Sequence, residues 1–356
     1  MRKIFEDKEK QRLFEATLQS INKDFGTSGS QILGDNKVDK LPRTSSGSYK
    51  IDELVGGGYP DGRIIEIYGE PSSGKSTLSL HFVAEVQKKG KLAVYIDSEN
   101  ALDVNYAKAL GVNVEDLVVA QPDSAEDCLQ VAERWVNSGL AGCVIVDSVA
   151  ALVPEAEIKG DIGDNHVGVL ARLMSQALRK LAYACNKTGT TMLFVNQTRE
   201  KIGVLFGNPT TTTGGKALPF YSSIRIEVRP TEITKTEGVA TSRKTKIKIV
   251  KNKVAPPFRE DTIDIEFGEG ISKTGEILDY GTELGILQKK GSWYWYGEER
   301  IGNGRDACKK ILKENDELRN ELDRKIRLYL NPESEDYIPT TKEELEESFI
   351  SDNSEV

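Results

Sequence analysis

The sequence has little of what metal sites, disulfides and membrane spans require. Its 356 residues include four cysteines and two histidines, without a Cys-x-x-Cys spacing. This composition gives no metal signature and favours reduced thiols. No apolar run reaches the ~18 residues of a membrane-spanning helix. The amphipathic N-terminus carries Glu6, Asp7, Glu9 and Glu15, which argues against a signal or transit peptide, so we expect a cytoplasmic protein.

Most of the chain also lacks net charge. The formal charge of −8 lies entirely in residues 333–356, which hold nine acidic residues and one lysine. Residues 1–332 carry 47 acidic and 47 basic residues. Such a tail either improves solubility or screens a basic surface elsewhere, and composition does not choose between these roles.

Strand-like and helix-like segments alternate from Arg63 to Gln197. Short apolar runs predict strands at residues 63–69, 92–99, 117–121, 141–148 and 190–197. Amphipathic spacing predicts helices at residues 75–90, 103–111, 124–139 and 166–189. Nearly continuous apolar strands between helices are typical of a mostly parallel sheet covered on both faces, so we predict an α/β fold.

The segments before residue 63 and after residue 197 do not continue this alternation of strands and helices. Residues 3–25 predict one helix, whose apolar stripe must pack on the chain's own core or on a neighbouring molecule. The β-rich segments 222–230, 244–253 and 261–270 predict an antiparallel extension of the sheet. Residues 270–331 predict a small α/β domain that ends in one helix over 305–330.

A glycine-rich segment follows the first predicted strand. GEPSSGKS, residues 69–76, fits G-x-x-x-x-G-K-[ST] between a strand and a helix. Backbone N–H groups of such a loop bind phosphates. Lys75 would reach the β- and γ-phosphates, and the Ser76 hydroxyl would hold Mg²⁺. The predicted nucleotide site comprises Gly69, Glu70, Pro71, Ser72, Ser73, Gly74, Lys75, Ser76 and Thr77.

Polar side chains follow the other strands of this region. Asp147 ends an apolar strand and would support Mg²⁺. Glu99 could activate the attacking water as a general base; the rival carboxylate, Asp97, is expected to lie within its strand. Gln197 either hydrogen-bonds the γ-phosphate or only caps its strand. In the first case hydrolysis would release the segment that follows.

That segment is a long connection without helical periodicity. Residues 196–217, NQTREKIGVLFGNPTTTTGGKA, contain four glycines and four consecutive threonines together with basic and apolar residues. Connections in compact domains usually have about 4–6 residues, and longer ones are mostly functional or disordered. The sequence therefore indicates a functional loop.

With these residues the chain resembles the bacterial RecA recombinase family. The specific stretches include GRIIEIYGEPSSGKSTL, IDSENALD, VIVDSVAALVPEAEI, NQTREKIGVLFGNPTTTTGGKAL and KIVKNKVAPPF. The resemblance implies a P-loop ATPase that uses ATP and Mg²⁺ and forms a helical filament on single-stranded DNA. It also implies pairing with homologous duplex DNA, strand exchange in DNA repair, and contacts with a self-cleaving repressor and with recombination mediators.

The family pattern implies four parts. These are a polymerisation helix with its linker (1–34), an ATPase core (35–269), an accessory duplex-DNA domain (270–331) and an acidic tail (332–356). The core would hold two DNA-binding loops, at residues 157–168 and 198–216.

Several residues match nucleotide positions of the family. Glu99 resembles its catalytic carboxylate and Gln197 its γ-phosphate sensor. Asp103 and Tyr106 match adenine contacts, and Phe267 replaces a tyrosine that packs near the nucleotide.

Other matches imply contacts between subunits. Lys251 and Lys253 match lysines that approach ATP on the adjacent subunit, and Phe220 matches a subunit contact. The chain has Lys216 and Pro219 where the family commonly has Asn and Lys, which leaves a bacterial or a phage origin open.

The implied DNA contacts are Arg172, Arg199, Gly214, Gly215 and Lys216. Cations neutralise phosphates, and glycine N–H groups bind phosphate oxygens. The apolar side chains of Val167 and Ile202 could wedge between base steps. In the accessory domain the candidate phosphate contacts are Lys289, Lys290, Arg300, Arg305, Lys309 and Lys310.

Three other functions fit parts of the sequence. A hexameric helicase shares the ATPase core, but a helicase's primase-binding domain is not evident. A non-catalytic scaffold on single-stranded DNA would use hydrolysis only to reset itself. A small-molecule kinase would leave both loops unexplained.

Overall fold

A computed structural model describes residues 7–26, 30, 41–200, 210–236 and 238–330. The chain divides into two compact units, residues 1–42 and 43–356. In the first unit, α1 (Lys8–Phe25) forms the predicted helix. Its N-cap Asp7 accepts the Glu9 N–H at 2.8 Å. None of its residues is buried. No described helix is long and apolar enough to cross a membrane.

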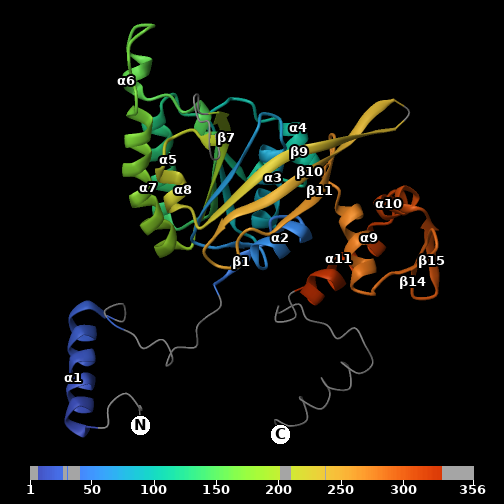
Figure 1. Ribbon diagram of the computed structural model, residues 1–356, viewed down its shortest axis with the longest axis horizontal. Coiled ribbons are helices and arrows are strands. Elements are labelled where there is room, and N and C mark those ends of the chain that lie inside the picture. Colours follow the sequence, from blue (N-terminus) through green and yellow to red (C-terminus); the bar gives the residue numbers. More distant parts are fainter. Residues whose placement is uncertain (1–6, 27–29, 31–40, 201–209, 237, 331–356) are drawn as a thin grey trace. The chain divides into compact units, whose positions relative to one another are not determined.

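The second unit contains the predicted sheet (Figure 1). Its main strands lie in the order β12-β11-β10-β9-β3-β7-β6-β4-β5. Strands β9, β3, β7, β6, β4 and β5 are parallel, and β10, β11 and β12 continue the sheet in antiparallel pairing. The α/β prediction and its antiparallel extension are therefore confirmed. The bounds are β3 (Ile64–Gly69), β4 (Leu92–Asp97), β5 (Leu117–Ala120), β6 (Ala141–Asp147), β7 (Thr191–Glu200), β9 (Ile224–Thr236), β10 (Val239–Asn252), β11 (Glu260–Glu266) and β12 (Gly270–Ile271).

Two apolar cores cover the two faces of this sheet. One core includes Phe82 and Leu78 of α3 and the other includes Met174 and Leu178 of α7. The predominance of apolar residues in the central strands follows from this double burial. The helices are α2 (Tyr49–Val55), α3 (Lys75–Lys88), α4 (Val104–Ala109), α5 (Ala125–Ser138), α6 (Glu155–Ile158), α7 (Val169–Thr188) and α8 (Ala217–Tyr221).

The predicted small domain follows β12. It contains α9 (Lys273–Glu283), then a three-stranded antiparallel sheet, then α10 (Arg305–Glu314) and α11 (Asp316–Leu330). The sheet consists of β13 (Gln288–Lys290), β14 (Trp293–Tyr296) and β15 (Glu299–Asn303). Tyr294 of β14 is buried in the apolar core of this domain.

Several predicted elements differ from the structure. The single helix expected over 305–330 is two helices, because Asn315 leaves the helical conformation and its Oδ1 caps the next helix at the Leu318 N–H, 3.0 Å away. The helix expected from residue 166 starts at Val169, after Gly168 in the left-handed conformation. The helices α2 and α9 were not predicted.

The described ends of the long connection after Gln197 contain regular structure that the sequence does not predict. β7 continues to Glu200 and pairs antiparallel with β8 (Thr210–Thr212), and α8 follows. A further small ribbon pairs β1 (Arg43–Thr44) with β2 (Tyr59–Pro60).

Candidate nucleotide site and DNA-facing loops

The glycine-rich segment joins the end of β3 to the start of α3. Gly74, at φ 98°, precedes the first helical residue, Lys75. A Cβ on Gly69 would lie 2.1 Å from the Val228 carbonyl oxygen, so only glycine fits there. The Lys75 Nζ donates to the Glu70 carbonyl oxygen at 2.6 Å. Burial lowers the pKa of Lys75, although nearby carboxylates oppose that shift.

The candidate magnesium ligands lie together. Asp147, at the end of β6, is buried, and Ser76 and Tyr95 hydrogen-bond its carboxylate, with Tyr95 Oη at 2.6 Å. Burial raises the pKa of Asp147. A hydroxyl and a carboxylate beside a phosphate-binding loop are a donor set that suits Mg²⁺.

Glu99 and Gln197 also meet, although 98 positions separate them. The Gln197 Nε2 donates to Glu99 Oε1 at 3.3 Å. The hydroxyl of Ser148 donates to the same oxygen. Asp97, by contrast, is buried in β4 and accepts the N–H groups of Ala101 and Leu102. The structure therefore leaves Glu99 as the carboxylate that faces Gln197.

The adenine-contact candidates border the same loop. The hydroxyl of Tyr106 hydrogen-bonds Thr77 Oγ1 at 2.9 Å. Asp103 caps α4 by accepting the N–H groups of Asn105 and Tyr106. Phe267, in the turn between β11 and β12, is 46% exposed and thus accessible to a flat ring.

The subunit-contact candidates form a separate group. The Lys251 Nζ donates to the carbonyl oxygens of Pro219 and Phe220, both at 2.8 Å. Burial, together with the cations Lys253 and Arg225, lowers the pKa of Lys251 to about 8. Lys253 and Phe220 have exposed side chains. Lys251 thus binds the helix that follows the second loop.

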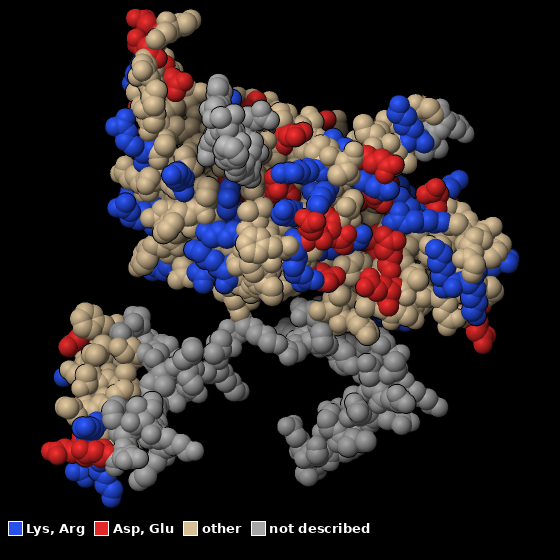
Figure 2. Space-filling model, viewed as in Figure 1, with Lys and Arg blue, Asp and Glu red and all other residues tan. Residues whose placement is uncertain are grey.

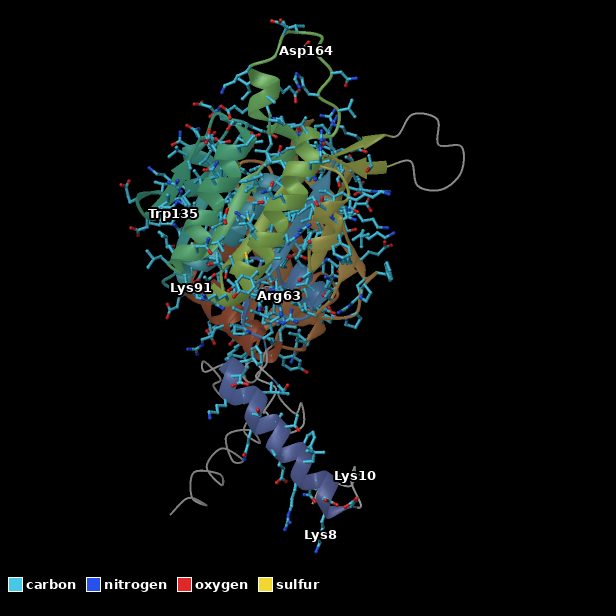
Figure 3. The ribbon with its side chains drawn as sticks, turned by 90° about the vertical axis from the view of Figure 1, so that its left-hand side faces the viewer. Lys8, Lys10, Arg63, Lys91, Trp135 and Asp164 are labelled. Carbon is cyan, nitrogen blue, oxygen red and sulfur yellow. The ribbon has the colours of Figure 1, made fainter. Side chains whose placement is uncertain are left out.

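The two candidate DNA loops converge at the start of α7. Asp164 marks the tip of the first loop, beyond α6 (Figure 3). Val167 is 83% exposed, and Arg172 is an exposed residue in the first turn of α7. A Cβ on Gly215 would lie 2.8 Å from Ala171 Cβ, so the second loop touches this helix.

The remaining DNA-contact candidates lie near that convergence. The Arg199 Nε donates to Thr213 Oγ1 at 3.2 Å, which joins the two sides of the second loop. Gly214, at φ 85°, is buried, and Lys216 is exposed. Ile202 lies outside the described residues.

A pocket joins the second loop to the phosphate-binding loop. Its position places the base of the second loop beside the expected phosphates. It is lined by Gly69, Glu70, Pro71, Thr198, Arg199, Glu227 and Arg229.

Three basic residues of α10 are paired with acidic residues of β11. Arg305 Nη1 lies 3.1 Å from Asp264 of β11. Glu266 binds Lys309 at 2.5 Å and Lys313 at 2.6 Å. Figure 2 shows acidic and basic side chains intermingled on the right-hand part of the molecule. Arg305 and Lys309 were expected to contact phosphates, and the structure instead pairs them with core carboxylates.

Lys310, also on α10, has an exposed side chain whose Nζ lies 4.0 Å from Glu314 Oε1. The other three candidates lie on the small sheet. Each cation is held near an aromatic ring, at 4.1 to 5.5 Å from the ring centre. The pairs are Lys289 with Tyr294, Lys290 with Trp295, and Arg300 with Trp293.

Comparison with known families decides the assignment. A family model described as RecA N-terminal domain matches residues 12–272, and one described as RecA C-terminal domain matches residues 275–331. The chain belongs to the RecA family. It is therefore a RecA-type recombinase and a DNA-dependent P-loop ATPase, as the sequence predicts.

Curated RecA relatives agree over almost the whole chain. Protein RecA of Staphylococcus epidermidis is 54% identical over 322 residues, which are 90% of this chain and 92% of that protein. Protein RecA of Bacillus subtilis is 53% identical over 342 residues, 96% and 98% of the two chains. A solved structure titled as the RadB recombinase is 20% identical, with a TM-score of 0.48, over 64% of this chain and 97% of that one. The assignment does not depend on it.

Proposed function

We propose that this RecA-family chain binds ATP and Mg²⁺ at residues 69–77 and couples hydrolysis to DNA binding through Gln197. Glu99 acts as general base for the attacking water, and Gln197 senses the γ-phosphate. The hydrogen bond from Gln197 Nε2 to Glu99 Oε1 is the observation that carries this proposal. It brings the start of the second loop to the carboxylate that would activate water.

DNA would then contact the two loops at residues 157–168 and 198–216. Arg172, Arg199 and Lys216 neutralise phosphates, and the N–H groups of Gly214 and Gly215 bind phosphate oxygens. Such contacts carry no base specificity, which suits a protein that leaves recognition to base pairing.

The proposal requires several copies of the chain on DNA. Lys251, Lys253 and the exposed Phe220 would meet the nucleotide site of the next subunit in a helical filament. Lys251 would then exchange the α8 carbonyl oxygens for a phosphate. The roles of a repressor and of mediator proteins rest on the resemblance alone.

ATP hydrolysis at low salt, with and without single-stranded DNA, tests the proposal. We expect DNA to stimulate the wild type strongly. Gln197→Ala should bind ATP yet lose the stimulation, and Gln130→Ala, an exposed glutamine on α5, should behave as the wild type. Equal rates with and without DNA in the wild type would contradict the sensor role.

The scaffold alternative makes a different prediction. Glu99→Gln should stop hydrolysis while retaining ATP and DNA binding. If this variant still pairs homologous strands, binding alone drives pairing and hydrolysis serves release. If pairing is lost while the filament persists, turnover is part of the exchange itself.

A further inference from the structure

Asn196 precedes the sensor residue on β7 and is completely buried. Its Nδ2 donates to Glu66 Oε1 and to the Thr213 carbonyl oxygen, both at 3.0 Å. Its Oδ1 accepts the Gln197 N–H at 2.9 Å. One amide therefore uses both donors and its acceptor, and it joins β3, the sensor and the far end of the second loop.

Glu66 holds the Asn196 amide in a fixed position. It lies in the middle of β3, the strand that ends at Gly69, and its side chain is 0% exposed. Its second oxygen, Oε2, pairs with Arg225 Nε of β9 at 2.5 Å. The Arg225 guanidinium lies over the Tyr68 ring at 4.6 Å from its centre. The fold tolerates a buried carboxylate that is paired with a cation in this way. Removal of the cation would leave an unpaired buried charge, which lowers the stability of the fold.

Thr213 is the point at which the second loop returns to the core. It follows β8 and precedes two glycines that adopt positive φ, and α8 begins soon afterwards. Its hydroxyl accepts from Arg199 Nε, at the outgoing side of the loop. A displacement of Thr213 would therefore shift both the glycine N–H groups and Lys216.

We propose that Asn196 is a positioning residue that transmits the state of Gln197 to the returning side of the second DNA loop. This inference rests on the sensor role of Gln197 proposed above. Because Gln197 and Thr213 bind the same amide, a movement of the sensor residue changes the hydrogen bond that holds the loop. Glu66, which is itself paired with Arg225, fixes the orientation of the Asn196 side chain. A movement of Gln197 therefore changes the hydrogen bond from Asn196 to Thr213, because the Asn196 side chain does not rotate to compensate.

A simpler role would give Asn196 only one task, which is to satisfy the buried carboxylate of Glu66. Two substitutions separate the roles. Asn196→Asp keeps the acceptor for the Gln197 N–H but loses both donated bonds, and it places a carboxylate against Glu66. Glu66→Gln supplies an amide that can donate to that carboxylate, so the double variant restores this contact and the charge near Arg225. Neither change restores a donor to the Thr213 carbonyl oxygen.

The test measures urea stability, ATP binding with a fluorescent analogue, and DNA-stimulated ATPase for the wild type, both single variants and the double variant. We expect the double variant to recover stability and ATP affinity relative to Asn196→Asp. Its DNA-stimulated kcat should remain at least about tenfold below wild type, with KM for ATP little changed. Full recovery of stimulated turnover would overturn the inference, as would full stimulation in Asn196→Asp alone.

A second variant covers the case in which Asn196→Asp does not fold. Asn196→Ser removes the amide without adding charge. Tryptic cleavage after the exposed Lys216 is then followed with a nonhydrolysable ATP analogue and single-stranded DNA. We expect protection in the wild type and none in Asn196→Ser at saturating nucleotide; equal protection would refute the inference. Gln197→Ala, measured alongside, separates the outcomes, because stimulated turnover in that variant would refute the sensor role itself.

Discussion

Glu276, at the start of α9, should make the stability of the protein depend on pH. Its side chain is buried, and it accepts the Tyr49 N–H at 2.9 Å and the Ser48 hydroxyl. Burial raises its pKa from 4.5 to about 7. Because the folded-state pKa is above the unfolded one, the stabilising contribution is complete below about pH 4.5 and is lost as the pH rises through 7.

The size of this effect follows from the two pKa values. Their difference corresponds to about 3 kcal/mol in the free energy of unfolding. About 2 kcal/mol of that amount falls between about pH 5.5 and 8.5. Glu276→Gln removes the titration but keeps both contacts, since its amide oxygen can accept from Tyr49 and its NH₂ group can donate to the Ser48 hydroxyl.

The assay is urea unfolding, followed by tryptophan fluorescence, to which Trp293 and Trp295 of the same small domain and Trp135 of α5 contribute. The free energy of unfolding of the wild type, relative to Glu276→Gln, should fall by about 2 kcal/mol from about pH 5.5 to 8.5. Glu283→Gln, at the exposed end of the same helix, is the control and should follow the wild type. Parallel pH curves for the wild type and Glu276→Gln would refute the reasoning.

Two other substitutions test the nucleotide site. Gly69→Ala should weaken ATP binding by more than about tenfold, because the new methyl group meets the carbonyl oxygen of Val228 and displaces the phosphate-binding backbone; unchanged binding by titration calorimetry would contradict this. Lys251 loses its charge as the pH rises through about 8. DNA-stimulated hydrolysis should therefore fall above that pH in the wild type and persist in Lys251→Arg, which stays charged, and identical pH profiles would exclude Lys251 as the cause.

The central sheet could be predicted because its strands are buried on both faces. Such strands read as apolar runs, and their carboxyl ends lie at one edge, so sequence alone suffices to place Asp147 and Gln197 near the glycine-rich loop. The preference for Glu99 over Asp97 depends only on counting where β4 ends. Apolar runs and strand ends could be predicted because each is set by residues that are close together in the sequence or by a pattern that repeats along the chain.

The features that escaped prediction depend on distant partners. Ser48 caps the helix α2 through its hydroxyl, which accepts the Ile51 N–H, but the hydroxyl also contacts Glu276 far along the chain. The hydrogen bonds of Asn196 reach Glu66, which is 130 positions away. Sequence periodicity reports which face of an element is buried, and it carries no information about which polar group meets it there.

Two lysines of the small domain show that distant partners also decide which basic side chains are available to bind DNA. In sequence, Lys290 and Lys309 are equivalent candidates for a phosphate contact. In the structure Lys309 binds Glu266 of β11, whereas Lys290 lies over the Trp295 ring at 5.5 Å and has an exposed side chain.

If this domain binds duplex DNA, the small sheet and the exposed Lys310 of α10 are therefore better placed for phosphate contacts than Lys309. Lys290→Gln should lower duplex affinity and reduce the slope of log affinity against log salt by about 1. Lys309→Gln should leave that slope unchanged and lower the stability of the domain, since it removes a partner from Glu266. An equal loss of slope in both variants, measured by fluorescence anisotropy over a salt series, would mean that DNA competes with Glu266 for Lys309 and that this ion pair opens on binding.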